Sequence, residues 1–301
     1  MQYSAIFSQL SKAHKGILYA FIGFTAFAFG DVASKWLTAD YSFFQVVFIN
    51  HSIAIIYLLA LLQYQVGVKV LARARKLPLH VFRGILNTSV ALSVIFSFSI
   101  LPIADVYTFI FTVPFFSALL GLWFYKQEIG LHRWLAIIVG FIGVVIGMQP
   151  GSSGFEPALL VPLLAGFLIA LKFTIARSLD GENTLLLGLW PTLISAPIAA
   201  ALSFYTGFEM INWQDLALHL FAGGCSAVGM VCVSQGFRIA PAAAVSPILY
   251  TEMIWALIFG YIIFGDVPTG MMMLGAAIII LSGLYLIERE HRASKEASKS
   301  S

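Results

Sequence analysis

Residues 43–66, FFQVVFINHSIAIIYLLALLQYQV, decide the fold, because this stretch is apolar for long enough to cross a membrane as a helix. A membrane-spanning helix needs about 20 mostly apolar residues, whereas a strand of an outer-membrane barrel has about ten residues of alternating polarity. The stretch holds no Asp, Glu, Lys or Arg over its 24 residues. We therefore interpret it as a transmembrane helix.

Runs of the same kind recur along the whole chain. The pattern predicts ten spans, at residues 16–38, 43–66, 81–101, 103–125, 134–149, 158–177, 185–206, 216–237, 241–264 and 270–287. Ten such helices use roughly 200 residues of the chain, and the remainder suffices only for termini and short loops. The sequence therefore predicts an all-α membrane protein of ten transmembrane helices.

The overall composition excludes several classes of protein. Hydrophobic residues make up 60% of the 301 residues, charged residues make up 10%, and the mean hydropathy is +0.92. Soluble domains carry about 45–50% apolar and about 25% charged residues. These values exclude a water-soluble enzyme, a disordered chain and a disulfide scaffold. The small net charge of +3, located near the membrane, argues against nucleic acid as a partner.

The distribution of basic residues predicts the orientation in the membrane. With the N-terminus placed in the cytoplasm, fifteen of the seventeen Lys and Arg residues fall on the cytoplasmic side, as the positive-inside rule requires. The other two, Lys35 and Lys172, fall within spans. We expect a bacterial-type inner-membrane protein with both termini in the cytoplasm. The basic segment 69–76 has an alternative interpretation, in which its charges bind a partner and do not reflect membrane orientation.

A weak internal repeat divides the chain into two halves of five spans. A shift of 142 residues overlays the first span on the sixth and aligns Lys35 with Arg177, and a shift of 138 aligns Glu128 with Asp266. Because each half has an odd number of spans, the second half enters the membrane inverted. Inverted repeats are typical of secondary transporters, with the substrate bound near the midplane between the halves.

These features give a domain organisation of four parts. Residues 1–15 are expected to form a cytoplasmic amphipathic segment on the membrane surface. The first repeat occupies 16–149 and the second occupies 158–287. Residues 288–301 are polar and charged, and we expect them to form a disordered cytoplasmic tail.

Three stretches of sequence carry a family resemblance. They are Gly30-Asp31-Val32-Ala33-Ser34-Lys35, then Leu101-Pro102 through Val113-Pro114-Phe115, Gln127-Glu128 and Arg133-Trp134 to Gly140-Phe141-Ile142-Gly143, and finally Ala240 through Pro247-Ile248-Leu249-Tyr250-Thr251-Glu252 to Gly265-Asp266. Over roughly 16–287 the chain resembles the EamA-type members of the drug/metabolite transporter superfamily. It looks most similar to the branch of S-adenosylmethionine uptake carriers, which share the Asp-Val-x-Ser-Lys pattern. It departs from the common pattern at Met253, where a proline often follows the glutamate. The resemblance implies a central cavity built from spans one, three, four, six, eight and nine.

Charged residues within the spans are the first candidates for a binding site. Each costs about 2.5–3.5 kcal/mol to place at the bilayer centre, so such residues are usually functional. Glu252 lies near the middle of the ninth span. A carboxylate there can exchange protons, pair with a cationic substrate, or serve as a hydrogen-bonded link between helices.

Two further charged residues belong to this group of candidates. Asp31 lies one turn deeper than Lys35 on the same helix face, so it either binds a ligand or forms a structural ion pair with Lys35. Lys172 lies too deep to reach the interface easily. It either forms a structural pair with Asp31 or Glu252, binds a carboxylate or phosphate of the substrate, or extends to the interface despite its depth.

Uncharged residues complete the predicted substrate-binding set. Asn87, Ser93 and Thr112 belong to polar stripes on spans three and four, which either line a cavity or join helices. Tyr250 and Trp255 flank Glu252, and Trp255 is either a stacking surface for a ligand or part of the core. Because Tyr250 and Glu252 point roughly 200° apart on a regular helix, both reach one site only if the helix is broken. The candidates for such a helix break are Pro114 and Pro247.

Motifs for enzymatic chemistry, metal binding and nucleotide binding do not occur in the sequence. We therefore predict no catalytic residues, no metal and no cofactor, and transport driven by a gradient or by exchange. The expected function is secondary active transport of a zwitterionic or mixed-charge metabolite, such as S-adenosylmethionine or an amino-acid-like compound. The expected partners are this small molecule, the lipid bilayer and, as a candidate coupling ion, protons. The alternatives are an exporter of broad specificity and, more remotely, an intramembrane enzyme or sensor. Monomer and homodimer both stay open.

Overall fold

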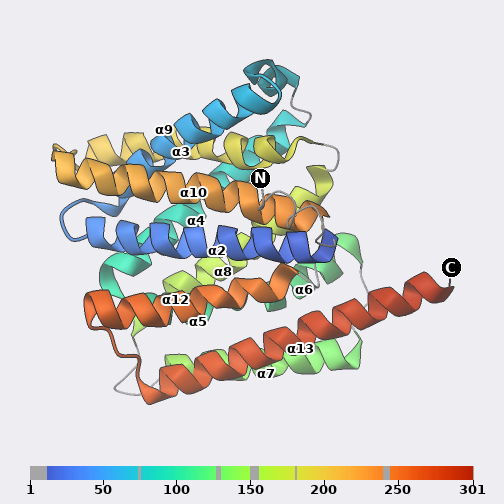
Figure 1. The fold of residues 1–301 in the computed structure, drawn as a ribbon. Helices are drawn as coiled ribbons and strands as arrows, with labels where there is room; N and C mark the ends of the chain where they lie inside the picture. The colour runs from blue at the N-terminus through green and yellow to red at the C-terminus, as the bar shows by residue number, and fades with distance from the viewer. Residues whose placement is uncertain are drawn as a thin grey trace, which may run out of the picture.

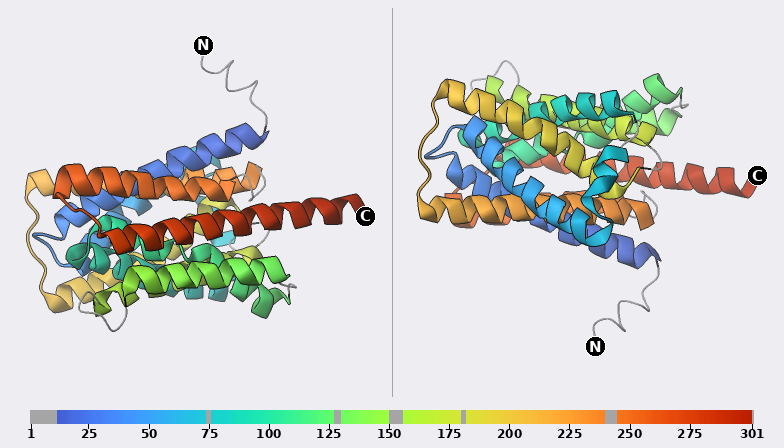
Figure 2. Two further views of the ribbon diagram at one scale, coloured as in Figure 1. Left: turned by 90° about the horizontal axis from the view of Figure 1, so that it is seen from below. Right: turned by 90° about the horizontal axis from the view of Figure 1, so that it is seen from above.

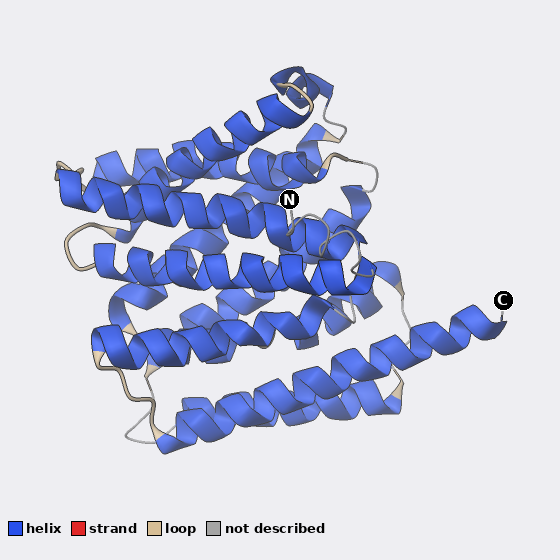
Figure 3. Ribbon diagram, viewed as in Figure 1, coloured by secondary structure: helices blue, strands red, loops and turns tan. Residues whose placement is uncertain are grey.

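The computed structural model describes residues 12–73, 76–126, 130–149, 156–179, 182–239 and 245–300. All regular secondary structure in these ranges is helical (Figure 3). The α-helices are α2 (Lys12–Leu37), α3 (Phe43–Gln65), α4 (Leu77–Ile100), α5 (Ile103–Ile110), α6 (Val113–Tyr125), α7 (Leu131–Met148), α8 (Leu160–Ala176), α9 (Thr184–Thr206), α10 (Trp213–Ile239), α12 (Thr251–Phe259) and α13 (Gly270–Ser300). Short 3₁₀ or π segments are η1 (Val68–Arg73), η2 (Pro157–Leu159), η3 (Arg177–Leu179), η4 (Ser246–Tyr250) and η5 (Gly260–Phe264).

The helices correspond to the spans that the sequence predicts. Among the described residues, seven helical stretches are long and apolar enough to cross a membrane, and α5 together with α6 forms one of them. Three shorter apolar stretches, Trp134–Met148, Ile248–Phe264 and Gly270–Tyr285, bring the number to ten. The all-helical class is therefore confirmed. The ninth predicted span begins outside the described residues, and the inverted orientation of the two halves stays a prediction.

At the two ends of the chain, the structure differs from the prediction. The predicted surface segment 1–15 lies mostly outside the described residues, and α2 already includes its last part. The predicted disordered tail is helical, because α13 continues to Ser300. The tail is rich in Ala, Glu, Lys and Arg, which favour helix, and it extends a helix whose nucleation cost is already met.

The helices lie side by side in one bundle (Figure 1). In this view α2 lies between α10 and α12, the pair α3 and α9 lies at one edge, and the pair α7 and α13 lies at the other. Views from below and above show that α2 begins and α13 ends at the same end of the bundle (Figure 2). Among the packed pairs, α2 contacts α10 and α4 contacts α8.

Two of the predicted spans are interrupted in the interior of the bundle. The fourth span turns at Phe111–Thr112, between α5 and α6, and Pro114 lies in the first turn of α6. The ninth span begins with the 3₁₀ segment η4 and becomes α-helical at Thr251. The side chain of Pro247 lies outside the described residues. These changes of helix geometry turn consecutive side chains away from the directions of a regular α-helix.

Glycines allow α7 and α13 to approach closely. A Cβ atom on Gly275 would lie 2.7 Å from the carbonyl oxygen of Gly143 and 2.8 Å from the backbone nitrogen of Gly147. Both neighbours are backbone atoms and cannot rotate away. Small residues at such crossings are the usual means of helix association in membranes.

We expect Gly275→Ala to destabilise the fold by about 1–3 kcal/mol, since the added methyl group pushes the α7 and α13 backbones apart. Gly270→Ala is the matched control, because a Cβ atom there meets nothing within 4 Å; it should change stability by less than about 0.5 kcal/mol. Thermal unfolding of the purified proteins in detergent measures both. Equal melting temperatures for the two variants would contradict this account of the α7–α13 contact.

Candidate functional site

An acidic cluster of Asp31, Tyr107 and Glu252 lies where α2, α5 and α12 meet. The Tyr107 hydroxyl donates a hydrogen bond to Oδ2 of Asp31. The charge of Asp31 acts on Glu252, and both carboxylates act on Tyr107. Tyr107 is 3% exposed and Glu252 is 6% exposed. The structure thus brings the two predicted carboxylates Asp31 and Glu252 together and adds a tyrosine to them.

Tyr250 points away from this cluster. Its ring packs edge-on against Phe111, with ring centroids 5.2 Å apart, and its hydroxyl lies against Gly283 of α13. Tyr250 ends the 3₁₀ segment η4, whereas Glu252 lies in the first turn of α12. Within the described part of the chain, the Tyr250 hydroxyl has no hydrogen-bond partner.

Lys35 pairs with Asp266, not with Asp31. Its Nζ atom donates to Oδ2 of Asp266 and to the carbonyl oxygen of Leu101, each at 2.9 Å. The ring of Phe264 lies 4.8 Å from the same Nζ atom. We name this set the Lys35–Asp266 clasp. It joins the end of α2 to the turn between α4 and α5 and to the loop before α13, so it ties three parts of one end of the bundle together.

A basic cluster of Arg83, Asn87 and Lys172 lies between α4 and α8. Nζ of Lys172 donates to Oδ1 of Asn87 at 3.0 Å. Arg83 is 5% exposed, and its charge acts on Lys172. Among the described residues no carboxylate forms a salt bridge with Lys172. The structure therefore pairs Lys172 with Asn87, and not with the predicted partners Asp31 or Glu252.

Polar residues of α3 form hydrogen bonds to α2 and α9. Nδ2 of Asn50 donates to Oγ of Ser34, on the helix that carries Asp31, at 3.0 Å. The adjacent His51 forms a hydrogen bond with Oγ of Ser195 at 2.9 Å, and the charge of Lys172 acts on it. The interior of the bundle thus contains polar groups from α2 across α3 to α8 and α9.

The remaining predicted site residues form hydrogen bonds with residues outside both clusters. Thr112 is buried and its hydroxyl donates to the carbonyl oxygen of Phe109 at 2.6 Å. The indole of Trp255 donates to Oγ1 of Thr25 at 3.1 Å, and its ring stacks on Phe259. Ser93 is half-buried, and its carbonyl oxygen accepts a bond from Ser97.

Sequence reasoning missed two residues of these clusters. The sequence assigns Arg83 to the cytoplasmic charges because it lies two residues into its predicted span, yet α4 begins earlier and buries it. Its spacing of four from Asn87 is the signal that places both on one helix face. Tyr107 carries no charge and lies in an apolar run, so no pattern in the sequence singles it out.

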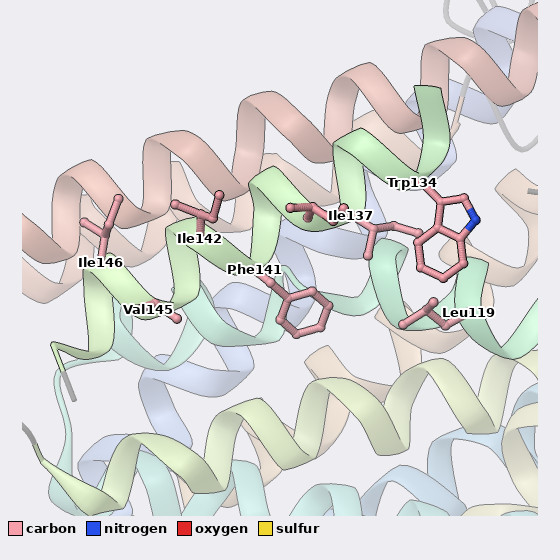
Figure 4. Close-up of a pocket in the computed structure, with 8 residues that line it drawn as sticks. Leu119, Trp134, Ile137, Phe141, Ile142, Val145 and Ile146 are labelled. Carbon is pink, nitrogen blue, oxygen red and sulfur yellow. The ribbon is translucent and has the colours of Figure 1, made fainter. Parts of the chain in front are cut away.

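A hollow on the outer surface differs in character from both clusters. It has a volume of about 530 Å³ and lies beside α7 (Figure 4). Its lining is apolar throughout and consists of Leu119, Trp134, Ile137, Ile138, Phe141, Ile142, Val145 and Ile146. An apolar, exposed surface of this kind suits contact with lipid chains. It offers no polar partner for a charged ligand.

Comparison with known families gives one match that covers most of the chain. Residues 14–148 and 157–288 each match the EamA-like transporter family. The two matched segments correspond closely to the predicted repeats 16–149 and 158–287. The match confirms the resemblance indicated by the motifs.

Curated relatives of similar length are named as transporters. A riboflavin transporter of Rhizobium johnstonii is 28% identical over 299 residues, which cover 98% of each chain. An S-adenosylmethionine uptake transporter of Rickettsia bellii is 27% identical over 278 residues, covering 92% of this chain and 95% of the relative. A riboflavin transporter of Vibrio cholerae is 26% identical over 289 residues, covering 93% and 95%. Together with the apolar helices, these names indicate a multi-pass membrane protein.

A solved crystal structure shares the fold. It has a TM-score of 0.63 at 16% sequence identity and covers 92% of this chain and 98% of that chain. At this identity the likeness concerns the fold alone.

Proposed function

The chain belongs to the EamA-like transporter family, and from this premise we propose that it is a secondary active transporter of a small mixed-charge metabolite. The proposed substrate is S-adenosylmethionine or an amino-acid-like compound, carried across the inner membrane by alternating access. Its transport is coupled to a gradient or to exchange. The family and the names of the relatives support the activity, and the charges of the interior support the substrate class.

The observation that carries the substrate class is the pair of oppositely charged clusters. The acidic cluster places two carboxyl groups in the interior, where they can pair with a cationic group, and the basic cluster places a guanidinium and an ammonium group there for an anionic group. A charge buried without a partner is strongly unfavourable, whereas a paired and hydrogen-bonded one is tolerated. A ligand that carries both signs of charge therefore has a complementary group for each cluster, which a purely lipophilic compound does not.

Alternating access is supported by the interrupted helices and by the packing of the halves. Broken helices near a central site are typical of transporters built from repeats. The contact of α2 with α10 has a counterpart in that of α8 with α4, as expected if the first and sixth spans, and the third and eighth, are equivalent. On this basis we propose that the two halves are inverted repeats that rock around the substrate.

Riboflavin is a second candidate substrate, because two of the three relatives described above are named riboflavin transporters. Riboflavin carries no charged group, so it would leave the buried charges of Arg83 and Lys172 without a counterion. The charge arrangement therefore favours the mixed-charge compound.

Uptake of radiolabelled S-adenosylmethionine and of riboflavin into proteoliposomes containing the purified full chain tests this proposal. We expect saturable uptake of S-adenosylmethionine that excess unlabelled S-adenosylmethionine suppresses and excess riboflavin does not. Empty liposomes are the control. Uptake of riboflavin alone would establish the second candidate, and uptake of neither would refute the proposed substrate class.

A further inference from the structure

We propose that Arg83, Asn87 and Lys172 form a subsite for an oxyanion of the ligand, a carboxylate or a phosphate. This inference rests on the proposed function in one respect, namely that the ligand is the transported compound. The existence of an oxyanion site depends only on the side chains of α4, α8 and α9.

Hydrogen-bond donors without acceptors accumulate at this place. Nε and Nη1 of Arg83 and Nδ2 of Asn87 are buried, and no partner for them occurs in the part of the chain that the structure describes. Asn87 is oriented by Lys172, which occupies its acceptor oxygen and leaves only the amide nitrogen to donate. Buried polar atoms in folded proteins normally have partners, so a set of unsatisfied donors indicates a missing acceptor.

The charges at this place also lack a counterion. Arg83 and Lys172 are close enough for their charges to act on each other, and they repel. In the described chain neither cation forms a salt bridge with a carboxylate. Glu182, an acidic residue near the cluster, lies 3.8 Å from Nε2 of His80. An anion between the two cations would remove the repulsion and satisfy the donors together.

Polar side chains of three helices, α4, α8 and α9, lie in this part of the bundle. His80, Arg83 and Asn87 are spaced by three and four residues, so they share one face of α4. Trp190 of α9 lies over His80 with ring centroids 5.9 Å apart, and its buried indole nitrogen has no acceptor among the described residues. Lys172 approaches from α8. The guanidinium fork of Arg83 matches the two oxygens of a carboxylate or phosphate, which gives the site its preference for oxyanions.

Paired ligands that differ only in the anionic group test the subsite. The probes are S-adenosylmethionine with its decarboxylated derivative, and riboflavin 5′-phosphate with riboflavin, titrated against the purified full chain in detergent. We expect the anionic member of at least one pair to bind at least about tenfold more tightly, since hydrogen bonds to charged groups are the strong ones. Arg83→Gln should abolish this preference. Lys69→Gln, which removes an exposed cation of η1 that is not part of the cluster, should retain it.

The outcomes separate the source of the anion and the two proposals. A preference within the S-adenosylmethionine pair identifies a carboxylate, and a preference within the flavin pair identifies a phosphate. Equal binding within every pair that binds, or an undiminished preference in Arg83→Gln, would overturn the subsite while leaving the transport activity intact. Arg83→Lys, which keeps a cation, should fold and bind with intermediate preference, and it replaces Arg83→Gln if that variant aggregates.

Failure of both pairs to bind would count against the proposed substrates, and simple oxyanions then test the subsite itself. Inorganic phosphate and acetate, compared with chloride at equal ionic strength, should raise the melting temperature of the natural protein more than that of Arg83→Gln. The same rise in both proteins would overturn the subsite.

Discussion

Replacing Glu252 by Gln is expected to reduce substrate uptake by about 100-fold while the protein still folds. Glu252 is almost fully buried and shares the acidic cluster with Asp31, so in the proposed mechanism it holds the cationic group of the substrate. Removal of one partner of a buried charge pair typically costs about 2–5 kcal/mol, and each 1.4 kcal/mol corresponds to a factor of ten. Gln has nearly the same shape as Glu, so the packing of α12 on α2 should persist.

Initial uptake rates in proteoliposomes, at several substrate concentrations, measure this effect. Glu209→Gln is the matched control, because Glu209 is exposed and lies outside both clusters. It should transport at the rate of the natural protein. Size-exclusion chromatography verifies that both variants are folded. Uptake by Glu252→Gln within twofold of the control would remove Glu252 from the mechanism.

Breaking the Lys35–Asp266 clasp is expected to open the adjacent end of the bundle. The clasp contributes two hydrogen bonds from a charged donor, each worth about 1.5–3 kcal/mol. Loss of one such bond shifts an equilibrium between closed and open forms by at least about tenfold. Lys35→Met should therefore expose residues of α4 that lie just inside the clasp, because the Leu101 carbonyl also loses its partner.

The accessibility of a cysteine at position 97 reports this opening. Ser97 is fully buried and lies one turn before Leu101, so Ser97→Cys introduces a protected thiol of similar size. In a background with Cys225 and Cys232 replaced by Ala, a maleimide should label this thiol at least about tenfold faster after Lys35→Met. Asp266→Asn should act in the same direction.

Lys69→Met is the control for the loss of a cation, and it should leave the labelling rate at position 97 unchanged. In the double variant of Lys35 and Asp266 the effect should not exceed that of the larger single change, since both substitutions remove one interaction. Fully additive effects, or slow labelling in every variant, would show that the clasp does not hold this end closed.

The helical fold was predictable because its signal is local. A span of about 20 apolar residues can be recognised without knowledge of the segments that it packs against. The predicted span 43–66 differs from the observed α3 by one residue. The tail after residue 287 was not predictable from polarity alone, because its helix-forming residues continue an existing helix. Hydropathy reports where a segment lies relative to water, and it does not report whether that segment is ordered.

The candidate site was predictable in its charges and not in its contacts. Asp31, Lys172 and Glu252 stand out because a charge within a span is costly. Their partners depend on which helix faces meet, so the sequence did not reveal that Lys172 contacts Asn87 or that Lys35 contacts Asp266. Arg83 escaped notice because a small error in the start of a span moved it from the interior to the boundary.

The helix α13 is longer than the hydrocarbon core of a bilayer is thick. A helix of 31 residues extends about 46 Å, whereas the hydrocarbon core of a bilayer is about 30 Å thick. Figure 2 shows its C-terminal part standing clear of the neighbouring helices. A fluorophore or affinity tag attached at Ser300 would therefore lie roughly 16 Å beyond the hydrocarbon boundary, in a fixed direction from the bundle. Energy transfer between a dye at this end of the chain and a partner dye would therefore report any tilt of α13 as a change in the distance between the two dyes.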